Sequence, residues 1–382
     1  MAIYLDYQAS TPIDPRVKAV MLEVMDADFA NPSSESHSAG WMARQRVEDA
    51  RETIAKAVGC GSDELIFTSG ATEADNLGVL GAALGAPEGR RKIIVGSTEH
   101  KAVLEAAFAA EKYGFSVELL PVDENGLIDP AELANRLDRE AAVVSVMLVN
   151  NEIGTIQPLK ELVALSSAAG AFFHSDATQA PTAIKVDLND LGVDAASFSS
   201  HKIYGPKGVG AFYISATAPW KPVPLLFGGG QEQGLRPGTL PTPLCVGLAE
   251  AFQILANEGF EERNHVAQLR DYLADLLIRA MPGSIITAPS AQRHPGNLHI
   301  RFKGIEADEL LARLQPNVLA STGSACTSGH LSESHVLTAI GMENTEAQQA
   351  VRFSLGRQTT KQEIEHAAWL IAESVEDCLS TT

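Results

Sequence analysis

The sequence predicts an α/β protein in which a largely parallel, doubly wound sheet is followed by a smaller α+β domain. Short apolar runs alternate with helical segments from about residue 60 to residue 214, a pattern typical of parallel sheets with helices on both faces. The alternation stops after residue 215. A length of 382 residues also exceeds what one compact core usually accommodates, so two domains are expected.

The expected strands of the sheet are short apolar segments. They cover residues 65–68, 92–97, 116–121, 142–149, 171–175, 195–199 and 209–214. Helices are expected between the earlier strands, at residues 73–84, 101–113, 130–137 and 159–169. Ligands of such sheets bind at the carboxyl ends of the strands, so the residues that follow each strand are the candidates for a functional site.

The second half of the chain has a different pattern. Residues 218–224 are rich in proline, and residues 227–238 are rich in glycine with little periodicity. A long amphipathic helix is expected from residue 242 through residue 277, where it would bridge two domains. We therefore expect a large domain of residues 1–255, with an N-terminal arm of residues 1–14, and a small C-terminal domain of residues 256–382.

The composition argues against several classes of protein. The net charge of −19 disfavours direct binding to nucleic acid or to an anionic membrane. The sequence has no signal-peptide pattern and no uncharged apolar run of 18 residues, so no membrane span is expected. The cysteines are far apart and form no CxxC pair, which argues against a metal site and is typical of a reducing cytoplasm. They are Cys60, Cys245, Cys326 and Cys378.

One lysine stands in a context that indicates chemistry. Lys202 follows the predicted strand at 195–199 within Ser199-Ser200-His201-Lys202, and a Gly-Pro-Lys-Gly turn comes after it. Lysine forms a Schiff base with an aldehyde cofactor, and pyridoxal phosphate is the commonest such cofactor. Ser199 and His201 could donate hydrogen bonds to its phosphate. An isolated lysine of this kind is more often an exposed loop residue, so the assignment depends on the rest of the chain.

Four other strand ends supply partners for such a cofactor. Thr72 follows Ser69-Gly70-Ala71 at a predicted helix start, where free N–H groups could hold a phosphate, although a simple helix cap fits as well. His100 could cover an aromatic ring or move a proton, and Asn151 could bind a cofactor oxygen or a carboxylate. Asp176 could pair with a pyridine nitrogen, and Gln179 could reach the ring hydroxyl. Separately, an exposed histidine, a turn and a helix cap would explain these residues too.

Together, these segments carry a resemblance. The chain resembles the cysteine desulfurases, the NifS/IscS-like group of the class V aminotransferase family, whose members have the fold type I architecture of pyridoxal phosphate enzymes. The resemblance extends from Tyr4 to Arg357. It rests on the ordered segments SGATEADN, TEHKAV, NNEIGT, DATQ, SSHKIYGPKG, RPGTLP and GSACTSG.

The resemblance implies a role for each matching residue. Lys202 would form the imine with pyridoxal phosphate and later move a proton, while His100 would stack on the ring. Thr239 would reach the phosphate of the other subunit, which implies a homodimer with shared sites. Asn151 and Arg352 would hold the carboxylate of L-cysteine. The remaining cofactor-binding residues would be Ala71, Thr72, Asp176, Gln179, Ser199 and His201.

Cys326 is the residue that would select the reaction. It lies among small residues and two glycines, in a segment expected to be a mobile loop. Its thiolate would attack the sulfur of the substrate, leaving a persulfide on Cys326 and releasing alanine, with His100 as a candidate base. The persulfide would then pass to an acceptor protein in iron–sulfur cluster assembly or a thiolation pathway. A selenocysteine lyase, a transaminase and a non-catalytic sulfur carrier are the alternatives.

Overall fold

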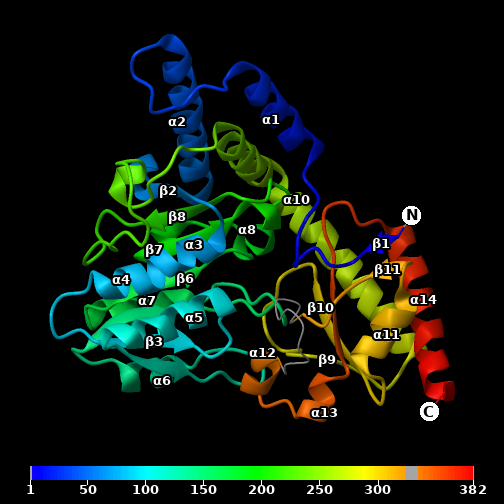
Figure 1. Ribbon diagram of the computed structural model, residues 1–382. Helices are drawn as coiled ribbons and strands as arrows, with labels where there is room; N and C mark the ends of the chain where they lie inside the picture. The colour runs from blue at the N-terminus through cyan, green and yellow to red at the C-terminus, as the bar shows by residue number, and fades with distance from the viewer. Residues whose placement is uncertain (1, 324–333, 382) are drawn as a thin grey trace.

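A seven-stranded sheet forms the centre of the larger part of the molecule (Figure 1). The computed structural model describes residues 2–323 and 334–381. The strand order is β2-β8-β7-β6-β5-β3-β4, and all neighbours are parallel except β8, which is antiparallel to both β7 and β2. The strands are β2 (Leu65–Thr68), β3 (Lys92–Gly96), β4 (Ser116–Leu120), β5 (Ala141–Ser145), β6 (Phe172–Asp176), β7 (Ala195–Ser199) and β8 (Gly210–Ile214).

Side chains alternate between the two faces of this sheet, and each face has its own apolar core. Phe172 and Phe212 belong to one core, whereas Phe173 and Tyr213 belong to the other. The first core is closed by α3 (Ala71–Asn76), its continuation η2 (Leu77–Gly81) and α4 (Ala82–Leu84), and by α5 (Lys101–Ala110) with η3 (Glu111–Tyr113). On the other face lie α1 (Pro15–Ala27), α2 (Ser38–Val58), α6 (Pro130–Arg136), α7 (Leu159–Ala168), α8 (Ala180–Ala183), α9 (Leu188–Leu191) and the start of α10 (Thr242–Ala280).

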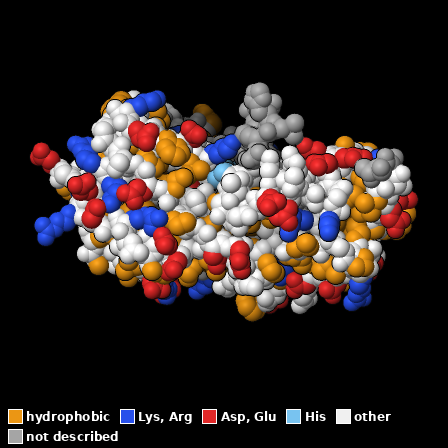
Figure 2. Space-filling model, turned by 90° about the horizontal axis from the view of Figure 1, so that it is seen from below, with side chains coloured by type: hydrophobic (Ala, Val, Ile, Leu, Met, Phe, Trp, Pro, Cys, Tyr) orange, Lys and Arg blue, Asp and Glu red, His pale blue; other side chains and the backbone are white. Residues whose placement is uncertain are grey.

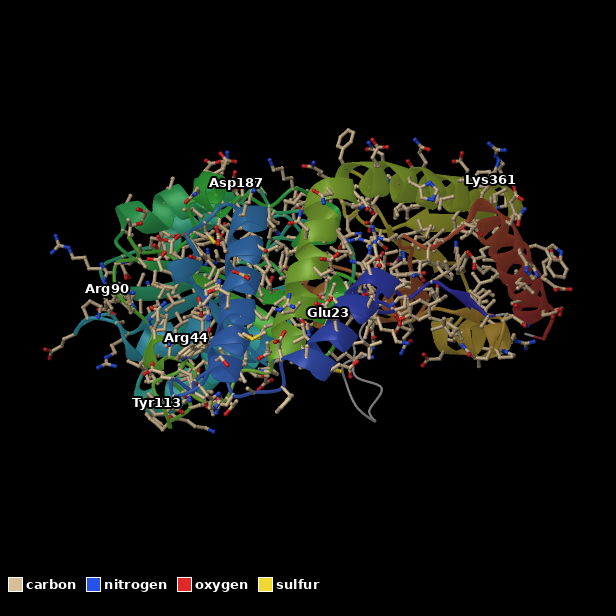
Figure 3. The ribbon with its side chains drawn as sticks, turned by 90° about the horizontal axis from the view of Figure 1, so that it is seen from above. Glu23, Arg44, Arg90, Tyr113, Asp187 and Lys361 are labelled. Carbon is tan, nitrogen blue, oxygen red and sulfur yellow. The ribbon has the colours of Figure 1, made fainter. Side chains whose placement is uncertain are left out.

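The helix α10 links the large sheet to a second core. Its 39 residues run without a break, and Leu255 packs in the core under the large sheet, whereas Val266 packs in the second core. Viewed from above, α1 with Glu23 and α2 with Arg44 lie alongside α10, and Lys361 marks the start of α14 at the other end of the molecule (Figure 3). The division into residues 1–255 and 256–382 remains a proposal.

The second core surrounds a small antiparallel sheet of order β12-β10-β9. Ile3 and Leu5 of the N-terminal arm pack into this core, and β1 pairs in parallel with β11. The elements of this region are β1 (Ile3–Tyr4), β9 (Ser284–Ile286), β10 (Asn297–Phe302), α11 (Ala307–Leu314), β11 (Val318–Leu319), α12 (His335–Ala339), α13 (Asn344–Ala347), β12 (Ala350–Ser354) and α14 (Lys361–Thr381). Short 3-10 turns are η1 (Ser62–Glu64), η4 (Ser200–Lys202) and η5 (Glu232–Gly234).

The predicted α/β class is confirmed, with a mostly parallel sheet and helices on both faces. Two features go beyond the sequence analysis. The helices α1 and α2 were not foreseen, since each turns only a narrow apolar stripe inward, such as Val17, Met21 and Val24 on α1. The reversed direction of β8 was not foreseen either. Among residues 2–323 and 334–381, no helix has both the length and the apolar character needed to cross a membrane.

Candidate active site

The carboxyl ends of several strands open into one cavity between the large sheet and the second core. The cavity has a volume of about 560 Å³. Strands β2, β3, β5, β6 and β7 all run in the same direction, so the segments that follow them meet at this edge. The lining includes the predicted site residues Ala71, Thr72, His100, Asn151, Asp176, Gln179, Ser199, His201, Lys202 and Arg352.

Lys202 ends the short turn η4 directly after β7. Its Nζ donates hydrogen bonds to the carbonyl oxygens of Gln8 at 2.6 Å and Ala9 at 2.9 Å, both in the N-terminal arm. Tyr204, two residues further on, has a φ of 66°, a left-handed conformation that is uncommon for a tyrosine. The amine is therefore held at the cavity by neutral backbone acceptors, which it can leave to react with a carbonyl compound.

The start of α3 forms one corner of the cavity. Gly70 has a φ of 150° and precedes the helix without a side-chain cap, so the first N–H groups of α3 remain available. The backbone of β8 approaches closely, since a Cβ on Gly210 would lie 2.8 Å from the Cα of Gly70. Ser199 completes this corner, because a Cβ on Gly70 would lie 3.8 Å from its Oγ. N–H groups and hydroxyls gathered in this way are suited to an anion.

His201 lies beside this corner as a neutral imidazole. Burial, and then the positive charges of Lys202 and Lys207, lower the pKa of His201 to about 4. Its Nδ1 lies 3.2 Å from the Oγ of Ser10, a hydroxyl of the N-terminal arm. At neutral pH, His201 can therefore donate one N–H to a ligand but brings no charge.

The floor of the cavity is acidic. Asp176 is the last residue of β6, and its Oδ1 accepts a hydrogen bond from the backbone N–H of Thr178 at 2.9 Å. The amide of Gln179 donates to the carbonyl oxygen of Gln8 at 3.0 Å. His100 caps α5, with its Nδ1 accepting from the N–H of Ala102 at 3.1 Å. Asp176 thus has a carboxylate at the base of the cavity that could pair with a protonated ring nitrogen.

Two further acids lie behind Asp176, and the sequence analysis did not identify them. Asp75 is 0% exposed and Glu99 is 1% exposed. The Oδ1 of Asp75 lies 3.7 Å from the Nε2 of His174, and ligand atoms of Asp75, His100 and Asp176 lie within 4.8 Å of one another. Burial, and then the charge of Asp176, raise the pKa of both Asp75 and Glu99 well above the usual values. Burial therefore favours the neutral form of both Asp75 and Glu99.

Arg352 projects from β12 of the second core and is 2% exposed. Its Nη1 donates to the carbonyl oxygen of Asn151 at 2.5 Å, and its Nη2 donates to Oδ1 of Asp6 at 2.7 Å and to Oγ of Ser321 at 3.0 Å. A planar guanidinium held in this way is suited to a carboxylate ligand. Asp6 was not foreseen as a site residue, although it lies in the Tyr4-Leu5-Asp6-Tyr7 segment at which the resemblance begins.

Among the residues that the structure describes, Thr239 is the one predicted site residue that does not line the cavity. Thr239 is exposed on the loop after η5. Cys326 lies outside the described residues. Of the described residues near it in sequence, Gly323 lines the cavity, and the Oγ of Ser334 donates to Oε2 of Glu152 at 2.6 Å.

Several lining residues were missed because no local sequence signal marks them. Gln8 and Ala9 belong to the N-terminal arm, Met147 follows β5, and Glu73 lies in the first turn of α3. Lys207 stands in the quoted Gly-Pro-Lys-Gly turn, but nothing in the spacing indicates that it faces the cavity.

Comparison with known proteins identifies the relatives of this arrangement. The aminotransferase class-V family model matches residues 3–366. A protein named cysteine desulfurase IscS from Rickettsia bellii (strain OSU 85-389) is 44% identical over 375 residues, covering 98% of this chain and 91% of the relative. The corresponding protein of Rickettsia rickettsii (strain Iowa) is 43% identical over 376 residues, with 98% and 92% coverage.

Solved structures agree with the sequence matches. A structure described as a NifS-like protein superimposes with a TM-score of 0.90 at 35% identity and covers 100% of both chains. A structure of SspA in complex with cysteine has a TM-score of 0.83 at 34% identity, with coverage of 94% of this chain and 100% of SspA.

Proposed function

The chain belongs to the aminotransferase class-V family, and we propose that it is a pyridoxal phosphate-dependent cysteine desulfurase that converts L-cysteine to L-alanine and delivers the sulfur to acceptor proteins. The observation that carries this proposal is the meeting of Lys202, Asp176 and Arg352 in one cavity. The 44% identity to a protein named cysteine desulfurase IscS, over 98% of the chain, supports the reaction.

The residues of the cavity fit pyridoxal phosphate. Gly70 leaves room for an anion at the start of α3, and Lys202 presents an amine to the same cavity. Asp176 offers an anionic partner for the ring nitrogen. When bound, the cofactor supplies an electron-withdrawing ring that stabilises negative charge at the Cα of an amino acid.

The binding of the cofactor and the movement of the substrate proton are assigned to residues of the chain. We assign to Lys202 the attachment of the cofactor and the movement of the proton at the substrate Cα. Asp176 would keep the ring nitrogen protonated, Gln179 would hold the ring hydroxyl, and His100 would cover the ring face. The phosphate is assigned to Ala71, Thr72, Ser199 and His201.

Arg352 and Asn151 are assigned to the substrate carboxylate. The hydrogen bonds from Arg352 to Asp6 and Ser321 hold the guanidinium in one orientation before the substrate arrives. This pre-organisation reduces the conformational entropy that binding would otherwise cost. The backbone carbonyl oxygen of Asn151 accepts from Arg352, and its side-chain amide can add a hydrogen bond to the carboxylate.

Cys326 is assigned the sulfur step. Its thiolate attacks the sulfur of the substrate, so that an S–S bond forms as the Cβ–S bond breaks. The electron pair of the broken bond stays with the carbon, which is then protonated to give alanine. The sulfur remains on Cys326 as a persulfide until the thiolate of an acceptor protein takes it. His100 is a candidate base for the Cys326 thiol.

A cytoplasmic location, based on the widely spaced cysteines, remains a prediction.

A homodimer is part of the proposal. Large apolar side chains are exposed near the tip of α1 and on the loop that precedes η5, including Phe29 at 85% and Phe227 at 88%. Trp41 and Met42 on α2 are exposed at 58% and 57%. Exposed apolar groups of this size mark contact surfaces. Pro32 and Arg44, close in sequence to these side chains, line one pocket with Leu240, the residue after Thr239, which supports the assignment of Thr239 to the phosphate of the partner subunit.

The reaction is tested by incubating the protein with L-cysteine and a reductant. We expect alanine and sulfide in equal amounts, and we expect Cys326→Ala to abolish sulfur transfer to a protein acceptor. The Lys202→Ala variant should lose the visible absorbance of the bound cofactor. A protein that consumes L-cysteine equally well without Cys326 would be a transaminase instead, and the sulfur assignment would be wrong.

A further inference from the structure

Gly70, Ser199 and the start of α3 form a corner of the cavity that is suited to an anion, here called the anion corner. The lining of the cavity also contains a cation to which no role has been assigned. Lys207 lines the cavity together with Gly208, at the turn between η4 and β8. Its side chain is exposed, and no described carboxylate lies within ion-pair distance of it.

The turn that carries Lys207 is fixed against the start of α3. Gly210, at the beginning of β8, pairs with both Thr68 and Ser199 and packs against Gly70. The three segments that form the anion corner are therefore held together by strand pairing. Lys207 lies three residues before Gly210, so its position relative to the corner is set by the sheet itself.

Without Lys207, the side chains around the anion corner supply too little positive charge to balance the negative charge of a phosphate group. A phosphate monoester carries about −1.5 to −2 charges near pH 7. His201 is neutral because its pKa is lowered to about 4. Glu73 is an acid in the lining, and its Oε1 accepts from Nε of Arg236 at 3.1 Å, so Arg236 is already paired.

The other cations of the lining have different partners. Arg352 donates to Asp6 at 2.7 Å and is assigned to the substrate carboxylate. Lys202 is assigned to the carbonyl carbon of the cofactor and not to its phosphate. The influence of Lys207 on the pKa of His201 is further support that its ammonium lies near the corner.

We propose that Lys207 is the counter-charge for the phosphate group of the bound cofactor. This proposal rests on the proposed function, because it takes pyridoxal phosphate as the ligand of the cavity. Lys207 acts through charge rather than through a fixed hydrogen bond, as a partly solvated ammonium does. The net charge of −19 makes such a local cation more valuable, because the protein as a whole repels an anion.

The test measures cofactor binding to the apoprotein, with pyridoxal phosphate and pyridoxal as the two probes. Pyridoxal has the same aldehyde and ring but lacks the phosphate. We expect Lys207→Gln to weaken the affinity for pyridoxal phosphate by about three- to tenfold at low salt, as expected for one charge pair at a partly exposed site. The affinity for pyridoxal should not change, and the loss should shrink as salt is added.

Two controls separate charge from structure. Lys207→Arg keeps the charge and should bind pyridoxal phosphate nearly as well as the wild type. Lys303→Gln removes a charge from an exposed lysine outside the cavity lining and should leave both affinities unchanged.

The outcomes separate this proposal from the proposed function. An equal loss of affinity for both probes in Lys207→Gln, or no loss for either, would overturn the role of Lys207. Failure of the wild-type protein to bind pyridoxal phosphate would instead overturn the cofactor assignment itself.

Discussion

The ion pair between Arg51 and Glu232 provides a quantitative test of the structure. The guanidinium of Arg51 donates from Nη1 and Nη2 to the two carboxylate oxygens of Glu232, at 2.8 and 2.6 Å. Glu232 also accepts the backbone N–H of Phe67, on the edge strand β2, at 2.5 Å. The two charged side chains are 10% and 2% exposed. This pair anchors the loop that leads to Thr239 on the edge of the large sheet.

Replacing Glu232 by Gln should destabilise the protein strongly. The variant keeps the size of the side chain but leaves the guanidinium of Arg51 without its buried counter-ion. Removing one partner of a buried pair costs about 3–5 kcal/mol, because the remaining charge is still desolvated. The glutamine N–H₂ group would also face either Arg51 or the N–H of Phe67, both of which are donors.

Glu48 supplies a matched control on the same guanidinium. Its Oε2 accepts from Nε of Arg51 at 3.1 Å, but its side chain is 51% exposed. An exposed pair contributes about 0–1 kcal/mol, so Glu48→Gln should change stability by less than that. The assay is urea unfolding at constant protein concentration, with the midpoint compared at an unchanged slope. Equal effects of the two substitutions, or a loss below about 1 kcal/mol for Glu232→Gln, would refute the reasoning.

Three further predictions concern buried ionisable groups. Because burial raises the pKa of Asp75, the folded protein keeps this group neutral while the unfolded chain ionises it above about pH 4, so wild-type stability is lost as pH rises. Asp75→Asn cannot ionise, so its stability relative to the wild type should rise by about 1.4 kcal/mol per pH unit from pH 5 up to the raised pKa of the folded group and level off above it, measured by urea unfolding; a constant difference would contradict this. Burial lowers the pKa of four histidines, so the unfolded chain takes up protons first and stability should fall as pH drops below about 6.5, with His299→Gln flattening the profile. The four are His174 and His201, each with a pKa of about 4, and His294 and His299, each with a pKa of about 3. Arg352→Lys should raise KM for L-cysteine roughly 10- to 100-fold through loss of the guanidinium fork, with the cofactor absorbance unchanged; an unaltered KM would exclude Arg352 from carboxylate binding.

The sequence indicated those parts of the site that depend on local pattern. Asp176 and Lys202 each follow an apolar run, and parallel strands bring such positions to one edge. The antiparallel direction of β8 also follows from a local feature of the sequence, the length of a connection. Its connection from β7 runs only through residues 200–209, which is too short for a crossover helix.

Other parts of the site depend on tertiary packing and could not be obtained from local pattern. Asp75 occupies a position on α3 that resembles an ordinary polar residue of a helix start. It becomes a neutral acid because Asp176 and the sheet enclose it completely. A short-range pattern carries no information about this enclosure, so the capping explanation and the buried-acid explanation look the same in the sequence.

The N-terminal arm explains why residues so far apart in sequence form one site. Gln8 accepts hydrogen bonds through its carbonyl oxygen from both Lys202 and Gln179, while Asp6 accepts one from Arg352. Ile3, just before these residues, pairs with Val318 beside the second core. The arm therefore contacts the cofactor side and the carboxylate side of the cavity within three residues. If the two cores move relative to each other, these hydrogen bonds must break or the arm must move with them. The arm therefore sets the distance between the amine of Lys202 and the guanidinium of Arg352, which is assigned to the substrate carboxylate.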